Sequence, residues 1–196
     1  MKRMKNEGIR SFIALDISPS NLLGIKELQE HLNRKTEGVR WINTNTIHLT
    51  LKFLGNISLE KVEVLCAALG VLSESHGSFH LSPSGIGAFP RLNRPKVIWL
   101  GVGGDLEALE VLWRDVEKIC YTVGFEKEER SFSPHLTLGR VKDFKKAAGL
   151  AKVLEGIGPF TFESYRVEAV HLYKSELRPE GAQYTIIKSF PLKREE

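Results

Sequence analysis

The chain is 196 residues long, which is enough for one substantial domain or for two small lobes that share a core. Hydrophobic residues make up 42% and charged residues 27%, as in soluble globular proteins, and no apolar run approaches the ~18 residues that span a bilayer. The formal net charge of +4 suits an anionic substrate, but a balance this mild does not by itself indicate a nucleic-acid-binding protein.

The first predicted element is a strand over residues 10–17, in which apolar side chains predominate. Because Asp16 and Ser18 interrupt this apolar stretch, it is too short for the core of a secretory signal, and we expect a cytoplasmic protein. Gly55-Asn56 is expected to end the last strand before the second helix. The elements predicted for the first half are a helix over 21–33, strands over 39–42 and 48–54, a helix over 58–72, and strands over 79–89 and 97–102.

The second half is predicted to repeat this alternation of helices and strands. Its elements are a long amphipathic helix over 105–122, a strand over 135–141, a helix over 144–154, and strands over 160–173 and 184–190. Each half contains a strand that opens with His-Leu-Thr-Leu, which favours two α+β lobes related by an approximate duplication. The predicted fold is therefore α+β, a single bilobal domain over residues 1–196 with largely antiparallel sheets and one motif in each lobe.

The repeated motif presents two different faces. Side chains alternate along a strand, so the histidine and threonine of each motif (His48 and Thr50, His135 and Thr137) point one way and the leucines the other, into a core. A lone histidine in a strand is more often structural than catalytic. However, an identical tetrapeptide headed by a rare residue recurs on two predicted strands, which favours a shared function. If the strands meet at a cleft, two imidazoles and two hydroxyls converge on one small ligand.

This residue set suits acid–base chemistry at phosphorus. Histidine exchanges a proton near neutral pH more readily than any other side chain. A neutral imidazole can activate water while a protonated one protonates the leaving oxygen, with the two on opposite sides of the phosphorus. Threonine hydroxyls beside the imidazoles can donate hydrogen bonds to the non-bridging oxygens, where charge must be held.

Metal binding is the main competing use of histidine. Catalytic zinc takes three protein ligands and structural zinc four, whereas each motif supplies one imidazole and no HExxH or CxxC pattern is nearby. Cys66 and Cys120 lie on predicted apolar helix faces, where buried reduced thiols are expected. We therefore expect neither a metal ion nor another cofactor.

Two arginines are candidates for phosphate binding. Arg140 lies five residues after His135, an odd offset that would turn it to the opposite face of a regular strand. A bulge at Gly139 would re-aim it toward the motif, where a guanidinium suits a phosphate. Arg130 could also face the groove, or it could form a surface ion pair with Glu128 or Glu129.

Other residues near the motifs could contact a nucleotide. Phe12, Tyr173 and Tyr184 are possible platforms for an unpaired base, although core packing is the commoner role of a strand aromatic. Ser175 could bind the substrate or form a turn.

The sequence resembles the two-histidine (2H) phosphoesterase superfamily, which is defined by two H-x-T/S-x motifs. More closely, it is similar to the bacterial and archaeal RNA 2′,3′-cyclic phosphodiesterases, also known as LigT-like proteins or 2′-5′ RNA ligases. The similar segments extend over almost the whole chain. They are RSFIALDI, RWINTNTIHLTLKFLG, GIGAFPRLNRPKVIWLGV, ERSFSPHLTLGRVK, LYKSEL and YTIIKSFPL.

This resemblance implies a bilobal fold with antiparallel sheets around a central cleft. It also implies metal-independent hydrolysis of RNA 2′,3′-cyclic phosphodiester ends to 2′-phosphomonoesters. By resemblance, His48 is the proton donor and His135 the proton acceptor, while Thr50, Thr137 and Arg140 bind the phosphate. The expected substrates are RNA ends or cyclic nucleotides, and we expect a monomer with no obligate protein partner and no membrane association. Two alternatives remain open, a reversible 2′-5′ RNA ligase and a non-catalytic RNA-binding module.

Overall fold

The computed structural model describes residues 8–158, 160–179 and 181–194. The helices of this part are α1 (Pro19–Asn33), the 3-10 helix η1 (Thr44–Thr46), α2 (Leu59–Ser73), α3 (Leu106–Thr122) and α4 (Leu150–Glu155). The strands are β1 (Ile9–Leu15), β2 (Val39–Trp41), β3 (Leu49–Ile57), β4 (Phe79–Phe89), β5 (Val97–Gly104), β6 (His135–Val141), β7 (Tyr165–Val167), β8 (Ala169–Arg178) and β9 (Gly181–Pro191). No helix in the described ranges is long and apolar enough to cross a membrane.

The strands form one curled antiparallel sheet in the order β7-β4-β5-β6-β3-β1-β8-β9, with β2 paired to the side of β6. Its two halves are β1, β3, β8 and β9 on one side, and β2, β4, β5, β6 and β7 on the other. They meet at a single antiparallel residue pair, Leu49 opposite Leu136. The predicted α+β fold with antiparallel sheets is thus confirmed, and the two expected sheets are joined at what we call the seam.

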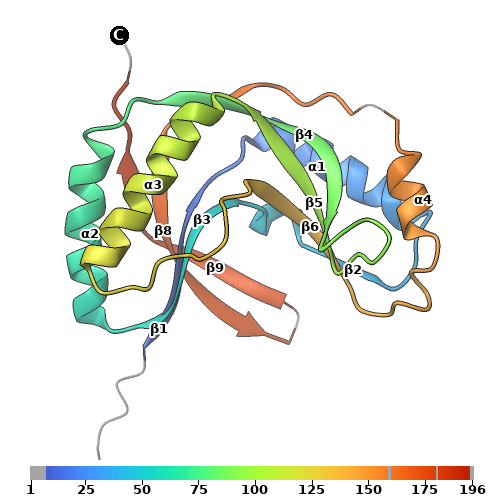
Figure 1. Ribbon diagram of the computed structural model, residues 1–196, viewed down its shortest axis with the longest axis horizontal. Coiled ribbons are helices and arrows are strands. Elements are labelled where there is room, and N and C mark those ends of the chain that lie inside the picture. Colours follow the sequence, from blue (N-terminus) through green and yellow to red (C-terminus); the bar gives the residue numbers. More distant parts are fainter. Residues whose placement is uncertain (1–7, 159, 180, 195–196) are drawn as a thin grey trace, which may run out of the picture.

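The helices cover the two halves separately. Helices α2 and α3 lie side by side on the half that contains β3, and α1 and α4 lie at the other half (Figure 1). Helix α1 follows β1 in the chain but contacts β2 and η1. It begins at Pro19 after the cap residue Ser18, and its Asn21 exchanges two hydrogen bonds with the backbone of Glu163, before β7. This crossing interlocks the halves.

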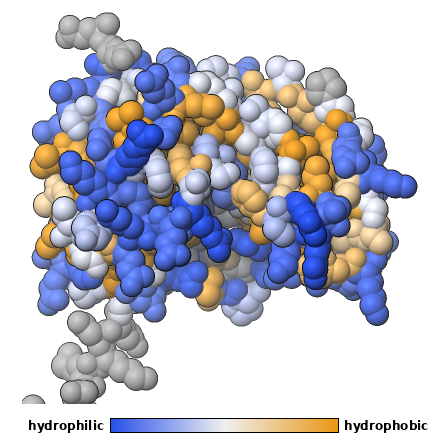
Figure 2. All heavy atoms as spheres, viewed as in Figure 1, coloured by the Kyte–Doolittle hydropathy of each residue, from blue (hydrophilic) through white to orange (hydrophobic). Residues whose placement is uncertain are grey.

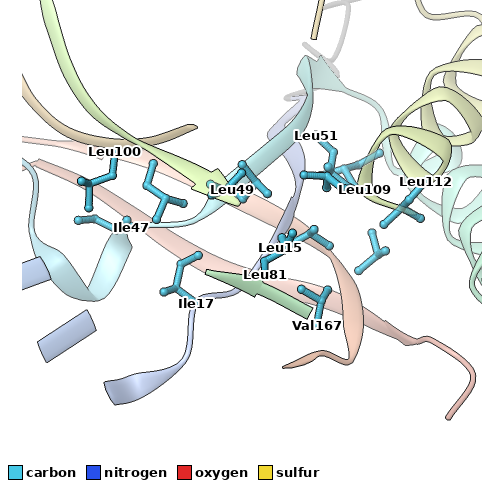
Figure 3. Close-up of a cluster of buried hydrophobic side chains, with 14 of the residues drawn as sticks. Leu15, Ile17, Ile47, Leu49, Leu51, Leu81, Leu100, Leu109, Leu112 and Val167 are labelled. Carbon is cyan, nitrogen blue, oxygen red and sulfur yellow. The ribbon is translucent and has the colours of Figure 1, made fainter. Parts of the chain in front are cut away.

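The hydrophobic core runs continuously through both halves. Leu49 and Leu51 of the first motif lie among core side chains that include Leu100 of β5 and Leu109 of α3 (Figure 3). The corresponding leucines of the second motif are fully buried as well. The predicted anchoring of both motifs by their leucines is therefore confirmed.

Strand β3 is longer than predicted. Gly55-Asn56 does not end it, because Gly55 lies opposite Ser11 and Asn56 opposite Arg10 in β1. Gly55 has a φ of +69°, and the register with β1 shifts just before it. A left-handed glycine at a bulge lets the strand continue to Ile57 where the sequence suggested a turn.

Two segments of the second half are less regular than predicted. The helix expected over 144–154 begins only at Leu150, because Gly149 before it has a left-handed backbone with φ +94°. The strand expected over 160–173 begins at Tyr165, and Glu168 separates β7 from β8. Strand β8 continues to Arg178, so Ser175 lies within a strand and does not form a turn.

Candidate active site

The seam brings the two motifs next to each other. Because Leu49 lies opposite Leu136 in an antiparallel pair, the register places His48 opposite Thr137 and Thr50 opposite His135. The two histidines are then diagonal neighbours, for which Cα separations of about 7–8 Å are typical. The leucines point into the core, so both histidine–threonine pairs share the other face. This spacing leaves room for one phosphoryl group between the imidazoles.

Both motifs carry a β-bulge at their final leucine. In β6, Trp99 pairs with Thr137 and Ile98 with Gly139, so Leu138 is an extra residue. In β3, register with β1 likewise skips Leu51. The extra residue shifts the alternation of side chains by one position. The side chain five positions after each histidine therefore lies on the same face of the sheet as the histidine. The bulge predicted to re-aim Arg140 is confirmed, at Leu138 and not at Gly139.

The motif face opens into a cleft of about 1060 Å³. Figure 2 shows that the molecular face viewed is hollowed near its middle and has hydrophilic side chains on both sides of the hollow. Both halves of the sheet and the β8–β9 hairpin contribute to the cleft. The cleft is lined by polar, charged and aromatic side chains that could bind a ligand or take part in catalysis. They include Arg10, Arg40, Asn43, Thr46, His48, Thr50, Phe53, His135, Thr137, Arg140, Lys142, Ser175, Arg178, Gln183 and Tyr184.

The cleft is strongly cationic. Among the described residues that line it, five are Lys or Arg and none is Asp or Glu. A concave surface with charges of one sign concentrates the field and attracts ligands of the opposite sign. The cleft is therefore built for an anion.

His48 is held by its neighbours on several sides. Its Nδ1 lies 2.8 Å from the carbonyl oxygen of Thr46, which fixes the Nδ1–H tautomer in the neutral ring. Phe12 stacks on the imidazole with ring centroids 4.6 Å apart, and Tyr184 meets it edge-on at 5.2 Å. Burial lowers the pKa of His48, while the hydrogen bond to Thr46 and the charge of Asp16 raise it. The ring is thus oriented with Nε2 as the atom left for proton transfer.

His135 repeats this arrangement in the other half. Its Nδ1 lies 2.7 Å from the carbonyl oxygen of Ser133, again two residues before the histidine. Phe89 meets the imidazole edge-on, with ring centroids 4.9 Å apart. The Trp99 ring lies farther from the imidazole, at 6.4 Å between centroids. Both motifs therefore direct the same nitrogen, Nε2, away from the backbone.

A polar network lies behind His48. Phe12 is stacked between His48 and Tyr173, and the Tyr173 hydroxyl donates a hydrogen bond to Asp16. The other carboxylate oxygen of Asp16 lies 3.4 Å from Nε2 of His171. Burial raises the pKa of Tyr173, so its hydroxyl remains a donor. The stack thus ends on a carboxylate whose charge reaches His48.

One side chain of α1 supports the bulge of the second motif. Gln29 is buried, and its Nε2 donates to the carbonyl oxygens of Ile42 and Leu138 at 2.9 and 2.8 Å. Its Oε1 accepts a hydrogen bond from the Thr44 hydroxyl at 2.8 Å. A bulge leaves backbone groups outside the regular ladder, and buried groups of this kind need partners. Gln29 therefore joins the bulge of one motif to the segment that leads into the other.

The structure brings most of the predicted residues together. His48, Thr50, His135, Thr137, Arg140 and Ser175 all line the cleft. Arg130 is not among the lining residues; its backbone N–H donates to the Glu128 carboxylate, in an exposed segment.

Of the three candidate base platforms, Tyr184 lines the cleft, and Phe12 and Tyr173 take the packing role that is commoner for a strand aromatic. Phe12 lines the cleft but is only 2% exposed, and its two faces are covered by His48 and Tyr173. Tyr173 lies behind Phe12, outside the lining residues. Both rings therefore support the histidine, because β1 and β8 stack them against it.

Sequence reasoning missed two features of the cleft. Phe53 is 69% exposed there, and its signal was its position five residues after His48, the same offset as that of Arg140 from His135. Arg40 and Arg178 also line the cleft, but they come from segments that carry no motif, whereas Lys142 directly follows the strand of the second motif. Only the pairing of β2 with β6 reveals Arg40, and only the β8–β9 hairpin reveals Arg178.

No group of three or more His, Cys, Asp or Glu side chains within the described ranges could hold a metal ion. The groups that line the cleft include two imidazoles, several hydroxyls, guanidinium groups and the Lys142 ammonium. Such a set can transfer protons and hold an anion.

Comparison with known proteins assigns these features to a family. The sequence pattern of the LigT-like phosphoesterases matches residues 15–99 and 104–184. The RNA 2′,3′-cyclic phosphodiesterase of Aeropyrum pernix is 34% identical over 74% of this chain and 82% of its own. The protein of the same name from Methanocaldococcus jannaschii is 31% identical over 93% of this chain and 100% of its own.

Solved structures agree with this likeness. Apo LigT of E. coli superposes with a TM-score of 0.76 at 27% identity and covers 95% of this chain and 98% of its own. LigT complexed with 3′-AMP gives a TM-score of 0.77 at 26% identity, over 95% and 99% of the two chains. Sequence, fold and the paired motifs thus lead to one assignment: the chain belongs to the LigT-like phosphoesterase family.

Proposed function

We propose that this protein hydrolyses RNA 2′,3′-cyclic phosphodiester ends to 2′-phosphomonoesters. The observation that carries the proposal is the seam, which sets two histidine–threonine pairs on one face of a cationic cleft. Relatives that cover most of the chain bear the name of this activity. We further propose that the enzyme acts as a cytoplasmic monomer without a metal or cofactor.

The catalytic roles follow from placing the phosphorus between the imidazoles. His135 accepts a proton from water through Nε2 as the water oxygen bonds to phosphorus. The bond from phosphorus to O3′ breaks, and His48 donates its proton to the departing O3′, which leaves a 2′-phosphate and a 3′-hydroxyl. Thr50, Thr137 and Arg140 donate hydrogen bonds to the non-bridging oxygens as charge builds up there.

His48 must carry a proton in order to donate it. In the free protein, burial lowers the pKa of His48. A bound cyclic phosphate is negatively charged, and an opposite charge beside an imidazole raises its pKa. Substrate binding thus favours the protonated His48 that the donor role requires.

A product assay tests the proposed function. An oligonucleotide that ends in a 2′,3′-cyclic phosphate is incubated with the protein in EDTA, and the products are separated by chromatography. We expect a 2′-phosphate end. A 3′-phosphate would reverse the assigned roles of O2′ and O3′. RNA binding without turnover of any cyclic phosphate would indicate the binding-module alternative, and joining to a 5′-hydroxyl RNA end would reveal ligase activity.

Replacing Asp16 by Asn is expected to shift one limb of the pH profile of kcat/KM. The charge of Asp16 raises the pKa of His48, so its removal lowers that pKa further. A proton donor then loses its proton at lower pH, and the alkaline limb moves to lower pH. Asn retains an oxygen that can accept the Tyr173 hydrogen bond.

The matched control is Asp115→Asn, which removes a carboxylate from beside another histidine, His76, 3.1 Å away. This variant is expected to keep the wild-type pH profile, because His76 is not among the residues lining the cleft. A shift of the acidic limb in Asp16→Asn would instead assign His48 as the base.

A further inference from the structure

The two motif strands have little direct contact with each other. Strands β3 and β6 share one antiparallel residue pair, Leu49 opposite Leu136, whereas each of them pairs over several residues with another strand. A single pair constrains the twist between two strands less than a longer ladder does. The orientation of His48 relative to the second motif therefore depends on further contacts.

Gln29 of α1 makes such a contact. Its side chain is buried, and its amide group fits its surroundings in one orientation only. The carbonyl oxygens of Ile42 and Leu138 can only accept hydrogen bonds, so the amide nitrogen faces them, at 2.9 and 2.8 Å. The amide oxygen then accepts a hydrogen bond from the Thr44 hydroxyl at 2.8 Å. The amide group thus binds two segments that lie far apart in the sequence.

The nitrogen of the Gln29 amide reaches the bulge of the second motif. The carbonyl oxygen of Leu138 also accepts a hydrogen bond from the Ile42 N–H at 2.8 Å, so two donors hold it. Leu138 is the extra residue of the bulge, and the bulge turns Arg140 toward the cleft. Gln29 therefore holds the residue on which the direction of Arg140 depends.

The oxygen of the Gln29 amide reaches the segment that orients His48. Thr44 is the first residue of η1, and its carbonyl oxygen accepts a hydrogen bond from the Ile47 N–H at 3.0 Å. Thr46, the last residue of η1, contacts Nδ1 of His48 through its carbonyl oxygen. A single turn of 3-10 helix thus separates the Gln29 amide from the carbonyl group that orients the imidazole.

We propose that Gln29 is a positioning residue that fixes the orientation of His48 relative to Arg140 and the second motif. The described residues that line the cleft do not include Gln29, so it acts on the substrate only through these groups. A carboxylate could not donate to either carbonyl group, and an apolar side chain would leave all three contacts unmade. The inference deepens the proposed function and rests on it wherever the readout is activity.

The test compares Gln29→Met with Asn21→Leu. Asn21 is a second buried amide of α1, and it exchanges two hydrogen bonds with the backbone of Glu163. Glu163 precedes β7, which β4 and β5 separate from β6 in the sheet. Both variants lose buried hydrogen bonds of the same helix, so both should melt below the wild-type temperature.

Only Gln29→Met is expected to slow the reaction. We expect kcat for a 2′,3′-cyclic phosphate to fall by about 10–10²-fold, because small displacements of catalytic groups cost that much. The loss should appear in kcat and leave KM nearly unchanged, since Gln29 does not touch the substrate. Asn21→Leu should keep the wild-type kcat.

Thr44→Val is a milder variant that interrupts only the contact with η1. It removes the hydroxyl group that donates to Gln29 and retains the branched shape of the side chain. We expect kcat to fall by about threefold, which corresponds to the loss of one hydrogen bond. The effects of Thr44→Val and Gln29→Met should not multiply when they are combined, because Gln29→Met has already removed that hydrogen bond.

The tautomer of His48 provides a readout that needs no activity. Long-range ¹H–¹⁵N correlations in NMR spectra report which nitrogen of a neutral imidazole carries the proton, and the His48 signals are assigned by their loss in His48→Ala. We expect the Nδ1–H tautomer in wild type and in Asn21→Leu. In Gln29→Met we expect a mixture of tautomers, because the Thr46 carbonyl is no longer held in place.

The outcomes separate the two proposals. If wild type hydrolyses no cyclic phosphate, the proposed function fails, and the tautomer of His48 alone decides the role of Gln29. Wild-type kcat or a single His48 tautomer in folded Gln29→Met would overturn that role, as would an equal loss of kcat in Asn21→Leu. A rise in KM at unchanged kcat, or effects of Thr44→Val and Gln29→Met that multiply, would overturn it as well.

Discussion

Alanine in place of His48 or of His135 is expected to lower kcat for 2′,3′-cyclic phosphate hydrolysis by about 10²–10⁴-fold. General acid and general base catalysis by a positioned side chain each contribute that much. Both imidazoles are held through Nδ1 by a backbone carbonyl, which leaves Nε2 for proton transfer, and alanine removes this positioned group. The effect is measured under single-turnover conditions, which report the chemical step.

The control is His80→Ala, which removes an exposed histidine that is not among the cleft residues. Its rate is expected to match wild type, and EDTA should leave all rates unchanged. Because the two catalytic histidines act as a unit, the double variant should lose little more than the worse single variant. A wild-type rate in either folded single variant would contradict the two-histidine mechanism.

Glu117→Ala is expected to destabilise the protein by about 3–5 kcal/mol, because it leaves the buried Lys52 ammonium without its ion-pair partner. Nζ of Lys52 lies 2.8 Å from Oε2 of Glu117, and the two side chains are 8% and 12% exposed. Lys52 also donates to the Glu126 carbonyl at 2.8 Å, and Glu117 accepts from the Glu128 N–H. Denaturant unfolding measures the loss.

Two variants separate charge from packing in this prediction. Glu110→Ala on the same helix breaks an ion pair with Arg114 whose side chains are 52% and 64% exposed, and it should cost under about 1 kcal/mol. Lys52→Met combined with Glu117→Leu removes both charges and should recover most of the stability. Equal stability of Glu117→Ala and Glu110→Ala would show that the buried pair does not hold this region.

The repeat of His-Leu-Thr-Leu was sufficient to predict the centre of the site. Alternation placed His48 and Thr50 on one face, and the buried leucines confirm the other face. The family resemblance and the antiparallel α+β fold were also predicted from sequence and are confirmed. The two faces of each motif could be predicted because they depend only on neighbouring residues in one strand.

The rest of the site depends on register between distant strands. In a regular strand, Lys52 would lie on the same face as Thr50. The bulge at Leu51 turns the Lys52 side chain into the interior, where it pairs with Glu117 of α3. The same shift exposes Phe53 in the cleft. The bulge was foreseen only where a glycine marked it, near Arg140. Arg40 reaches the site only because β2 pairs with β6.

The bulges also bear on which bond of the substrate is broken. At the seam, the two histidine–threonine pairs are nearly interchangeable, so a cyclic phosphate turned by half a revolution would meet the same groups with donor and acceptor exchanged. The positions after the bulges remove this degeneracy, since one motif presents the apolar ring of Phe53 and the other the guanidinium of Arg140. A nucleotide with one anionic and one aromatic end fits such a cleft in one orientation. We therefore expect the residues five positions after the histidines to help decide which way round the nucleotide binds, and hence which bond is broken.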